Sequence, residues 1–253
     1  MKNRWARYCS WSSCFSLILA VSVFCSPTGL FAEEFDWRNV NGQNWLTSVK
    51  SQFGGTCWAY ASCGALESKY MLTRDDITYE PDVSEQQLVW ETNPDLGDSV
   101  DGGKTCNSLD YFTSHGVVLE SECPTQGTDV GAPPYWPLAS GWANRVFKSA
   151  SNYNLFAQGT NLDYIKSCVK AYGPLTLRME VDNDWYDPAP APNRGNHAVV
   201  IVGFHDNVNG ESAPGGGYWI IRNSWGAGWN GDGYGAVAYA TRPTYETPSI
   251  WNS

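Results

Sequence analysis

The sequence predicts an α+β fold in which a helical first half precedes a β-rich second half. Residues 57–70 place four side chains on one helical stripe at three- to four-residue spacing: Ala59, Cys63, Leu66 and Tyr70. After residue 174 the chain changes to runs of β-branched and aromatic residues with glycine-rich joints, which are typical of strands. We therefore expect a helical lobe followed by a β-rich lobe.

Periodicity and end signals predict four helices, at residues 57–70, 84–92, 105–114 and 161–172. Ser84 and Gln87 form a capping-box pattern at the start of the second helix. Thr160 and Asp163 are expected to cap the fourth helix, which Gly173 and the following proline end.

Strands are predicted at residues 175–181, 197–204, 218–223 and 234–240. The first of them alternates apolar and polar side chains, as a half-buried strand does. A polar, glycine-rich loop at 205–217 separates the second strand from the third.

The composition is that of a folded, acidic chain. Its 253 residues include 13 Trp and 14 Tyr, only 17% are charged, and the net charge is −10. Lys2, Arg4 and Arg7 lie in the first 32 residues, so the remainder carries 13 basic against 26 acidic residues. Such a surface repels nucleic acid and anionic membranes, and we expect neither as a partner.

Residues 1–32 have the pattern of a secretory signal peptide, with basic residues followed by an apolar run at 15–24. We expect cleavage after Ala32, leaving one domain at 33–253 with a helical lobe at about 45–140 and a β-rich lobe at about 141–240. The alternative is a membrane anchor, although the apolar run is short for a span. The protein is expected to be secreted or extracytoplasmic. Periplasm, cell surface and a lysosome-like compartment fit equally well.

Five cysteines remain after residue 32: Cys57, Cys63, Cys106, Cys123 and Cys168. An odd number in an exported protein indicates one free thiol and two disulfides, and we expect at least one disulfide to form. If Cys57 is the free thiol, the other four allow three pairings. The alternative is four buried, unpaired cysteines.

Cys57 follows a small-residue turn and starts the first helix, where unpaired N–H groups and the helix dipole favour a thiolate. A nucleophilic cysteine needs a base and a group that orients it. His197 opens one predicted strand and Asn223 ends another, so they are the candidates for these roles. Gln52, together with the Cys57 backbone N–H, can stabilise a developing oxyanion.

Seven segments carry a resemblance to the papain-like cysteine peptidases: DWR (36–38), VKSQ (49–52), GGTCWAY (54–60), SEQQLV (84–89), DGG (101–103), NHAV (196–199) and NSWGAGW (223–229). The resemblance implies a two-lobe fold, with a helical lobe, a β-barrel-like lobe and the active-site cleft between them. It implies a secreted endopeptidase that acts on peptides or proteins as a monomer, without metal or cofactor. The Cys57 thiolate and the His197 imidazolium would form the catalytic pair and an acyl-enzyme intermediate, with Gln52 and Asn223 as the other two catalytic residues.

The resemblance also implies which residues contact the substrate: Gly55, Gly102, Gly103, Lys104, Arg178, Asn196 and Trp225. The backbone of Gly102 and Gly103 should pair with an extended peptide. In the family, the tryptophan at the position of Trp225 shields the Asn–His hydrogen bond. We expect Lys104 and Arg178 to form a basic pocket that favours acidic or polar side chains. The alternative for Arg178 is plain solvent exposure.

The chain departs from the family in three further places. Gly54 and Val100 stand where the family has two bridged cysteines, so one disulfide is missing as a whole. The interval from Gln52 to Cys57 is one residue shorter than usual, which affects the oxyanion geometry. Only residues 33–35 separate the expected cleavage site from the DWR motif, so we expect no inhibitory pro-segment.

Two other function classes stay open. The fold could serve as a non-catalytic binding or surface-assembly module, or as an exopeptidase or transpeptidase with one end of its cleft blocked. The GAGWNG segment at 226–231 does not open a helix, which disfavours a nucleotide site, and DNVNGE at 206–211 lacks a calcium-loop pattern. His115 is expected in the last turn of a helix and His205 in an exposed loop.

Overall fold

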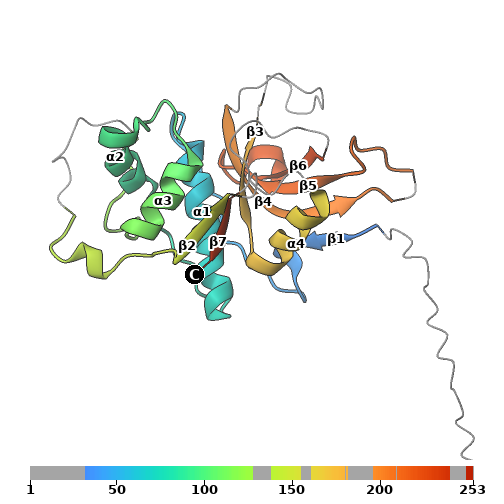
Figure 1. Ribbon diagram of the computed structural model, residues 1–253, viewed down its shortest axis with the longest axis horizontal. Helices are drawn as coiled ribbons and strands as arrows, with labels where there is room; N and C mark the ends of the chain where they lie inside the picture. Colours follow the sequence, from blue (N-terminus) through green and yellow to red (C-terminus); the bar gives the residue numbers. More distant parts are fainter. Residues whose placement is uncertain are drawn as a thin grey trace, which may run out of the picture. The chain divides into compact units, whose positions relative to one another are not determined.

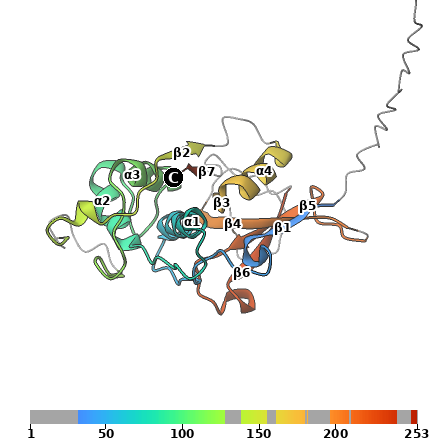
Figure 2. The same cartoon turned by 90° about the horizontal axis from the view of Figure 1, so that it is seen from below.

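Helix α1 (Cys57–Arg74) is buried along most of its length because two further helices pack on it from one side and the sheet packs on it from the other (Figures 1 and 2). The computed structural model describes residues 32–127, 138–154, 161–179, 181, 196–208, 210–239 and 249–252. Helices α2 (Glu85–Leu96) and α3 (Thr105–Ser114) accompany α1 in the helical lobe. The predicted amphipathic stripe on α1 is therefore too narrow, since this helix is covered on more than one side.

The helix caps follow local side-chain chemistry. The Ser84 hydroxyl accepts from the Gln87 backbone N–H at 3.0 Å, as predicted for the start of α2. Helix α4 (Leu162–Tyr172) is capped instead by Asn161, whose side chain accepts from the Tyr164 N–H at 3.1 Å. The expected cap, Thr160, lies outside the described residues, and the asparagine one position later performs this function.

The strands of the described residues form one antiparallel sheet in the order β2-β7-β3-β4-β5-β6, with β1 also paired to β4. Their bounds are β1 Glu34–Asp36, β2 Ser151–Asn154, β3 Leu175–Met179, β4 His197–Asp206, β5 Gly217–Arg222, β6 Tyr234–Ala238 and β7 Ser249–Asn252. Short 3-10 turns occupy Trp37–Asn39, Trp142–Asn144 and Trp229–Gly231. The mixed architecture confirms the predicted α+β fold.

Strand β4 is a central strand of the sheet, paired with β3, β5 and β1, and it also packs against α1. Its first eight residues are buried, because strands flank it and helices cover it. Gly203 is required where β1 crosses, since a Cβ at this position would lie 2.2 Å from the Phe35 carbonyl oxygen. This close approach ties the first described strand to the strand that starts with His197.

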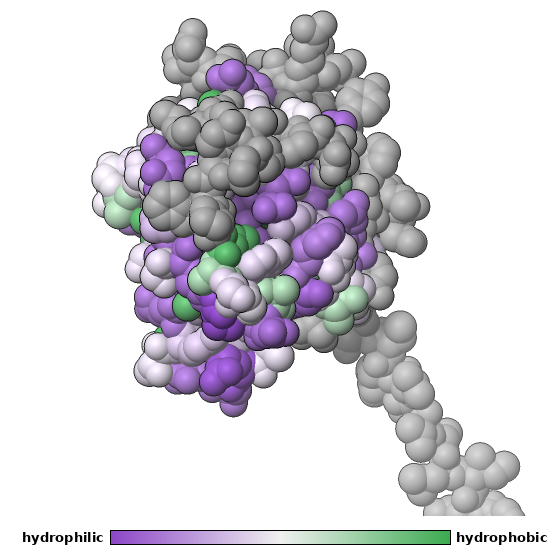
Figure 3. All heavy atoms as spheres, turned by 90° about the vertical axis from the view of Figure 1, so that its left-hand side faces the viewer, coloured by the Kyte–Doolittle hydropathy of each residue, from purple (hydrophilic) through white to green (hydrophobic). Residues whose placement is uncertain are grey.

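One apolar core runs through both lobes and includes Trp58 and Phe112 on the helical side and Phe204 and Ile221 on the sheet side. The face at the helical end is largely hydrophilic, and its apolar residues are scattered in small patches (Figure 3). Among the described residues, no helix has the length and apolarity needed to cross a bilayer. The expected signal peptide lies outside the described residues.

The four predicted helices and four predicted strands are all present, with boundaries that differ by a few residues. Strands β1, β2 and β7 were not predicted, because short strands carry little periodicity of their own. His205 was expected in an exposed loop but lies in β4. Its ring stacks on Tyr218 at 5.1 Å, and its Nε2 lies 3.0 Å from a Glu211 carboxylate oxygen.

Candidate active site

Cys57 is the first residue of α1, and a tight turn holds it there. Gly54 has a φ of 52°, which favours glycine. Gly55 packs so closely on the neighbouring segment that a Cβ would lie 2.7 Å from the main-chain carbonyl carbon of Asp101. Both glycines are therefore needed to present the thiol at the start of the helix.

His197 is the first residue of β4, opposite Met179 of β3. The next residue, Ala198, directs its backbone N–H at the Cys57 sulfur, which lowers the pKa of that thiol. The packing of β4 against α1 thus brings the imidazole-bearing strand to the cysteine, although they are 140 positions apart in the chain.

Asn223 follows β5 and holds the imidazole. Its Oδ1 oxygen lies 2.8 Å from His197 Nε2 and also accepts the Ser224 backbone N–H at 2.8 Å. Because that oxygen can only accept, the Nε2 atom carries the hydrogen. The Nδ1 atom is then the ring nitrogen that can exchange a proton with a thiol.

Trp225 covers the ring of His197. The two ring centroids are 4.7 Å apart, and Trp229 packs edge-on against Trp225 at 5.7 Å. Trp225 is 40% exposed, so one side of it faces solvent while the other shields the imidazole. An indole at this place keeps water from competing for the His197–Asn223 hydrogen bond.

Burial shifts the pKa of both Cys57 and His197 in the direction that favours the neutral form. It raises the pKa of the Cys57 thiol, although the Ala198 and Trp58 N–H groups and the charge of Arg178 act in the opposite direction. Burial lowers the pKa of His197, and the Asn223 hydrogen bond only partly offsets it. Burial therefore opposes the pKa shift expected from the helix N-terminus, because a buried group loses the solvent that would stabilise its charge.

Gln52 is anchored to Ser224, the residue that follows Asn223. Its backbone N–H donates to the Ser224 carbonyl at 2.7 Å, and its Oε1 accepts the Ser224 hydroxyl at 2.6 Å. Its Nε2 donates to the Gly54 carbonyl at 2.9 Å. A primary amide carries two N–H groups, so the second can serve an oxyanion.

Gly102 and Gly103 belong to the segment that packs against the first turn of α1. Gly102 forms an isolated bridge with Ser99 and has a φ of 154°. A Cβ on Gly103 would lie 2.4 Å from the ring of Trp58, the residue after the cysteine. Glycine here lets the backbone approach the first turn of α1.

Three other residues expected to contact substrate have different surroundings. Arg178 lies opposite Ala198 in the β3–β4 register, and its positive charge acts to lower the pKa of the Cys57 thiol. Lys104 is exposed just before α3. The Asn196 side chain accepts the Val181 backbone N–H at 2.8 Å and donates to the Val181 carbonyl at 2.7 Å, so the residue before His197 is attached to the backbone just after β3.

The expected disulfide is not formed in the described part of the chain, where Cys57, Cys63, Cys123 and Cys168 are thiols. Cys63 and Cys123 are completely buried and Cys168 is nearly so. Cys63 lies on α1, Cys168 on α4 and Cys123 in a bend outside the helices and strands. They pack as small apolar side chains. Burial raises the pKa of Cys123 to about 11. Within the same described residues, no group of histidine, cysteine and carboxylate side chains could hold a metal ion.

The arrangement of a helix-start cysteine, a histidine and an asparagine has a counterpart among known proteins. The family model described as papain family cysteine protease matches residues 31–249. The chain belongs to the papain family.

Curated papain-family relatives come from plants and animals. The chain is 30% identical over 229 residues to "Probable cysteine protease RD19C" of Arabidopsis thaliana. This match covers 82% of this chain and 56% of the relative. It is 28% identical to "Digestive cysteine proteinase 2" of Homarus americanus, over 85% of this chain and 64% of the relative. The chain is 30% identical to "Cathepsin O" of Homo sapiens, and the match covers 80% of this chain and 60% of the relative. The chain thus spans roughly three-fifths of the length of these relatives.

The solved structure of a digestive procathepsin L2 proteinase from Tenebrio molitor larval midgut has the same fold. The TM-score is 0.71 at 28% identity, over 88% of this chain and 69% of the other. A second procathepsin L from the same source has a TM-score of 0.71 at 23% identity. These matches confirm the predicted two-lobe papain fold.

The missing family disulfide leaves its two positions in contact. A Cβ on Gly54 would lie 3.6 Å from the Val100 Cβ, and the Gly55 N–H donates to the Val100 carbonyl. Backbone contact therefore holds the turn before Cys57 against this segment, as a bridge would.

Sequence reasoning missed Ser224, which holds Gln52, and the Ala198 N–H, which faces the thiol. Both positions lie within the NSWGAGW and NHAV motifs, one residue after Asn223 and His197. These two motifs were therefore the available signal, although no local pattern predicts these particular contacts.

Proposed function

We propose that this chain is an exported cysteine endopeptidase that hydrolyses peptide bonds through an acyl-enzyme. The observation that carries the proposal is the imidazole of His197, which Asn223 holds through Nε2, on a strand whose next residue directs its backbone N–H at the Cys57 sulfur. A base fixed in one tautomer beside a helix-start cysteine is the arrangement that thiol acyl transfer needs.

In the first half-reaction the Cys57 thiol gives its proton to His197 Nδ1 and the sulfur attacks the peptide carbonyl carbon. The Ala198 and Trp58 N–H groups and the charge of Arg178 stabilise the thiolate as it forms. The oxyanion of the tetrahedral intermediate takes hydrogen bonds from the Cys57 N–H and the Gln52 amide. The C–N bond then breaks, and His197 returns its proton to the leaving amine, which leaves a thioester.

In the second half-reaction His197, now neutral, removes a proton from a water molecule. The resulting hydroxide attacks the thioester carbonyl, the C–S bond breaks, and the sulfur recovers the proton from His197. Asn223 keeps the ring aligned through both steps, and Trp225 limits the access of water to the Nε2 hydrogen bond. No cofactor is needed.

We propose that the substrate lies extended along Gly102 and Gly103, with its second residue before the cut near Arg178. A guanidinium at this position favours an acidic or polar side chain over Leu or Phe. A peptide library varied at that residue tests the preference, with Arg178→Met as the comparison. A strong preference for Leu or Phe in the unaltered protein would refute this part of the proposal.

An extracytoplasmic location follows from the predicted signal peptide, and the digestive proteinases among the relatives support it. We expect the mature protein to start near Glu33. The mass of the exported protein gives the cleavage site directly. Retention of residues 1–31 in a membrane fraction would instead support the anchor alternative.

The central test is labelling with a peptidyl epoxide that reacts with nucleophilic thiols, applied to the native protein and to Cys57→Ser. We expect one equivalent of label on Cys57, competition by substrate peptide and no label on the variant. The buried thiols of Cys63 and Cys123 should remain unmodified. Cleavage within a long peptide distinguishes an endopeptidase from an exopeptidase, and transfer to an added amine identifies a transpeptidase. Absence of all three activities would leave the binding-module alternative.

A further inference from the structure

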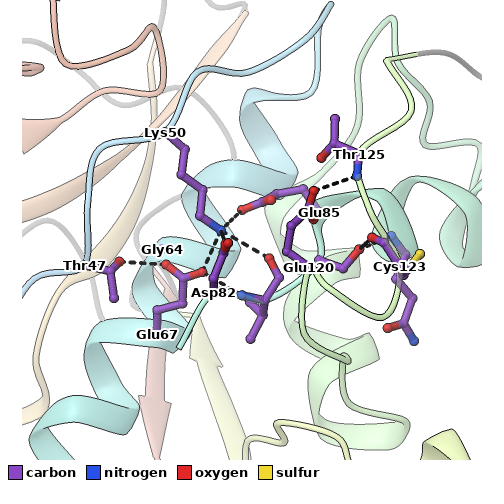
Figure 4. Close-up of polar contacts among 12 residues, drawn as sticks. Thr47, Lys50, Gly64, Glu67, Asp82, Glu85, Glu120, Cys123 and Thr125 are labelled. Atoms are coloured by element: carbon purple, nitrogen blue, oxygen red, sulfur yellow. Dashed lines mark hydrogen bonds and ion pairs between the residues drawn. The ribbon is translucent and has the colours of Figure 1, made fainter. Parts of the chain in front are cut away.

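The carboxylate of Glu67 is a buried junction ten residues after Cys57 on α1. Glu67 is 1% exposed. Its Oε2 accepts the Thr47 hydroxyl at 2.7 Å, and its Oε1 accepts the Lys50 ammonium at 2.8 Å and the Val83 N–H at 3.0 Å. Figure 4 shows the Thr47 and Lys50 side chains pointing at this carboxylate.

Two of these donors belong to the segment that carries Gln52. Thr47 and Lys50 precede Gln52 in one extended stretch without helix or strand. Their hydrogen bonds to Glu67 attach this stretch to α1, the helix that starts with Cys57. Because the stretch has no secondary structure of its own, such side-chain contacts determine where it lies.

The same stretch runs beside the segment that carries Asn223. Arg222 Nη1 donates to the Thr47 carbonyl at 2.9 Å and to the Thr47 hydroxyl oxygen at 3.1 Å. Further along, the Gly226 N–H donates to the Lys50 carbonyl at 3.0 Å. Thr47 is therefore the residue through which Glu67 reaches Arg222, the neighbour of Asn223.

The packing leaves little room for adjustment at this junction. A Cβ on Gly64, one turn before Glu67, would lie 1.9 Å from Arg222 Nη2, so the guanidinium rests directly on α1. A cavity of about 20 Å3 separates the elements here, and its lining includes Lys50, Glu67, Arg222 and Asn223. Glu67 and Asn223 therefore line the same small cavity.

We propose that Glu67, acting through Thr47, is a positioning residue that fixes the three segments bearing Gln52, Cys57 and Asn223 relative to one another. The inference rests on the proposed peptidase function. A carboxylate suits this role because it accepts at both oxygens, whereas a glutamine would present an NH2 group to either the Lys50 ammonium or the Thr47 hydroxyl. Neither Glu67 nor Thr47 takes part in the chemistry itself.

Two substitutions at Thr47 form the matched test. Thr47→Val keeps the shape and removes the hydroxyl that connects Glu67 with Arg222, while Thr47→Ser keeps the hydroxyl and removes a methyl group. Glu67→Gln is the direct variant. Glu122→Gln, which removes only an exposed ion pair with Arg145, controls for loss of a carboxylate.

The readouts are kcat and KM on a fluorogenic peptide, the midpoint of unfolding, and the rate at which Cys57 reacts with a small neutral disulfide as a function of pH. We expect Thr47→Val to lower kcat about tenfold and Glu67→Gln up to about 100-fold with little change in KM, because small misplacements of reacting groups are costly. Thr47→Ser should stay within about twofold of the unaltered protein. The pH profile of thiol reactivity should shift in Thr47→Val and not in Thr47→Ser.

Equal kcat values and superimposable pH profiles for Thr47→Val and Thr47→Ser would overturn the inference, even if both lower the unfolding midpoint. If Glu67→Gln fails to fold, the comparison of Thr47→Val with Thr47→Ser still tests the positioning role. The thiol-reactivity profile needs no peptidase activity. An inactive unaltered protein would therefore refute the proposed function, while a shift confined to Thr47→Val would still support the positioning role.

Discussion

The Nε2 nitrogen of His197 lies 2.8 Å from the Oδ1 oxygen of Asn223. Both residues are almost fully buried, and the Ser224 N–H fixes the same oxygen. The amide therefore has one orientation, and so does the ring that it holds. Orientation of a base is one of the few catalytic contributions that can be removed without removing a reacting group.

Replacing Asn223 by alanine should lower kcat by about 10- to 100-fold with a small effect on KM, because the imidazole can then rotate out of line. Steady-state kinetics on a peptide substrate measure this. Asn152→Ala, which removes a surface hydrogen bond to Asp110, is the control and should leave both constants unchanged. Equal kinetics for the two variants would contradict the assigned role of Asn223.

Removal of the Gln52 amide should reduce kcat by about 10²- to 10³-fold, the usual loss for one oxyanion donor. Gln52→Ala is the variant, and Gln126→Ala is a matched control, since Gln126 is exposed and its Nε2 also donates to a carbonyl two residues away. A loss below tenfold would mean that the shortened Gln52–Cys57 interval prevents the amide from reaching the oxyanion.

Glu85 should make the protein less stable as the pH rises from acid to weakly alkaline. Burial, reinforced by the nearby Glu67, outweighs the attraction of Lys50 and raises the pKa of Glu85 from 4.5 to about 8. The folded state therefore binds a proton that the unfolded state releases. This contribution is complete below about pH 4.5 and is lost as the pH rises through about 8.

Urea unfolding between pH 5 and pH 8 tests this, with Glu85→Gln as the comparison. Within this window each pH unit can change the free energy of unfolding by up to about 1.4 kcal/mol. The unaltered protein should lose stability relative to Glu85→Gln as the pH rises. Parallel stability curves for the two proteins would rule out a proton uptake at Glu85.

The disulfide that the family carries can be restored at Gly54 and Val100. The 3.6 Å gap between the Val100 Cβ and a Cβ built on Gly54 lies in the range that a disulfide spans. Closing a loop of this length favours the folded state by about 3–4 kcal/mol before strain. Strain is expected, because Gly54 has a positive φ and the added Cβ would lie 2.7 Å from the Val100 carbonyl oxygen.

We therefore expect Gly54→Cys/Val100→Cys to form a bridge under oxidising conditions and to unfold at a higher temperature than the same protein after reduction. Comparing the two redox states of one variant cancels the effect of the substitutions themselves. If the thiols stay reduced, or if reduction raises the unfolding temperature, the turn cannot accept the bridge.

Local patterns predicted the four helices and the four longer strands. The spacing in α1, the cap at Ser84 and the β-branched run after His197 predicted their elements, because each has a local physical cause. The contact between His197 and Asn223 followed from their motifs. Strands β1 and β7 were missed, since their pairing depends on partners far away in the chain.

Properties that depend on burial could not be predicted from the sequence. A cysteine at a helix start favours a thiolate locally, yet the cover by β4 reverses the direction of its pKa shift. Glu67 looks like an ordinary helical glutamate in the sequence. Only the packing of Thr47, Lys50 and Val83 around it gives it three donors.

Strand β4 lies between β3 and β5, and β1 pairs with its far end. Amide hydrogens in such a strand exchange with deuterated water mainly when the whole sheet opens, and not through local fraying. His197 starts this strand. The His197 ring is therefore attached to a central strand of the sheet that the described residues form, and heat inactivation should coincide with global denaturation.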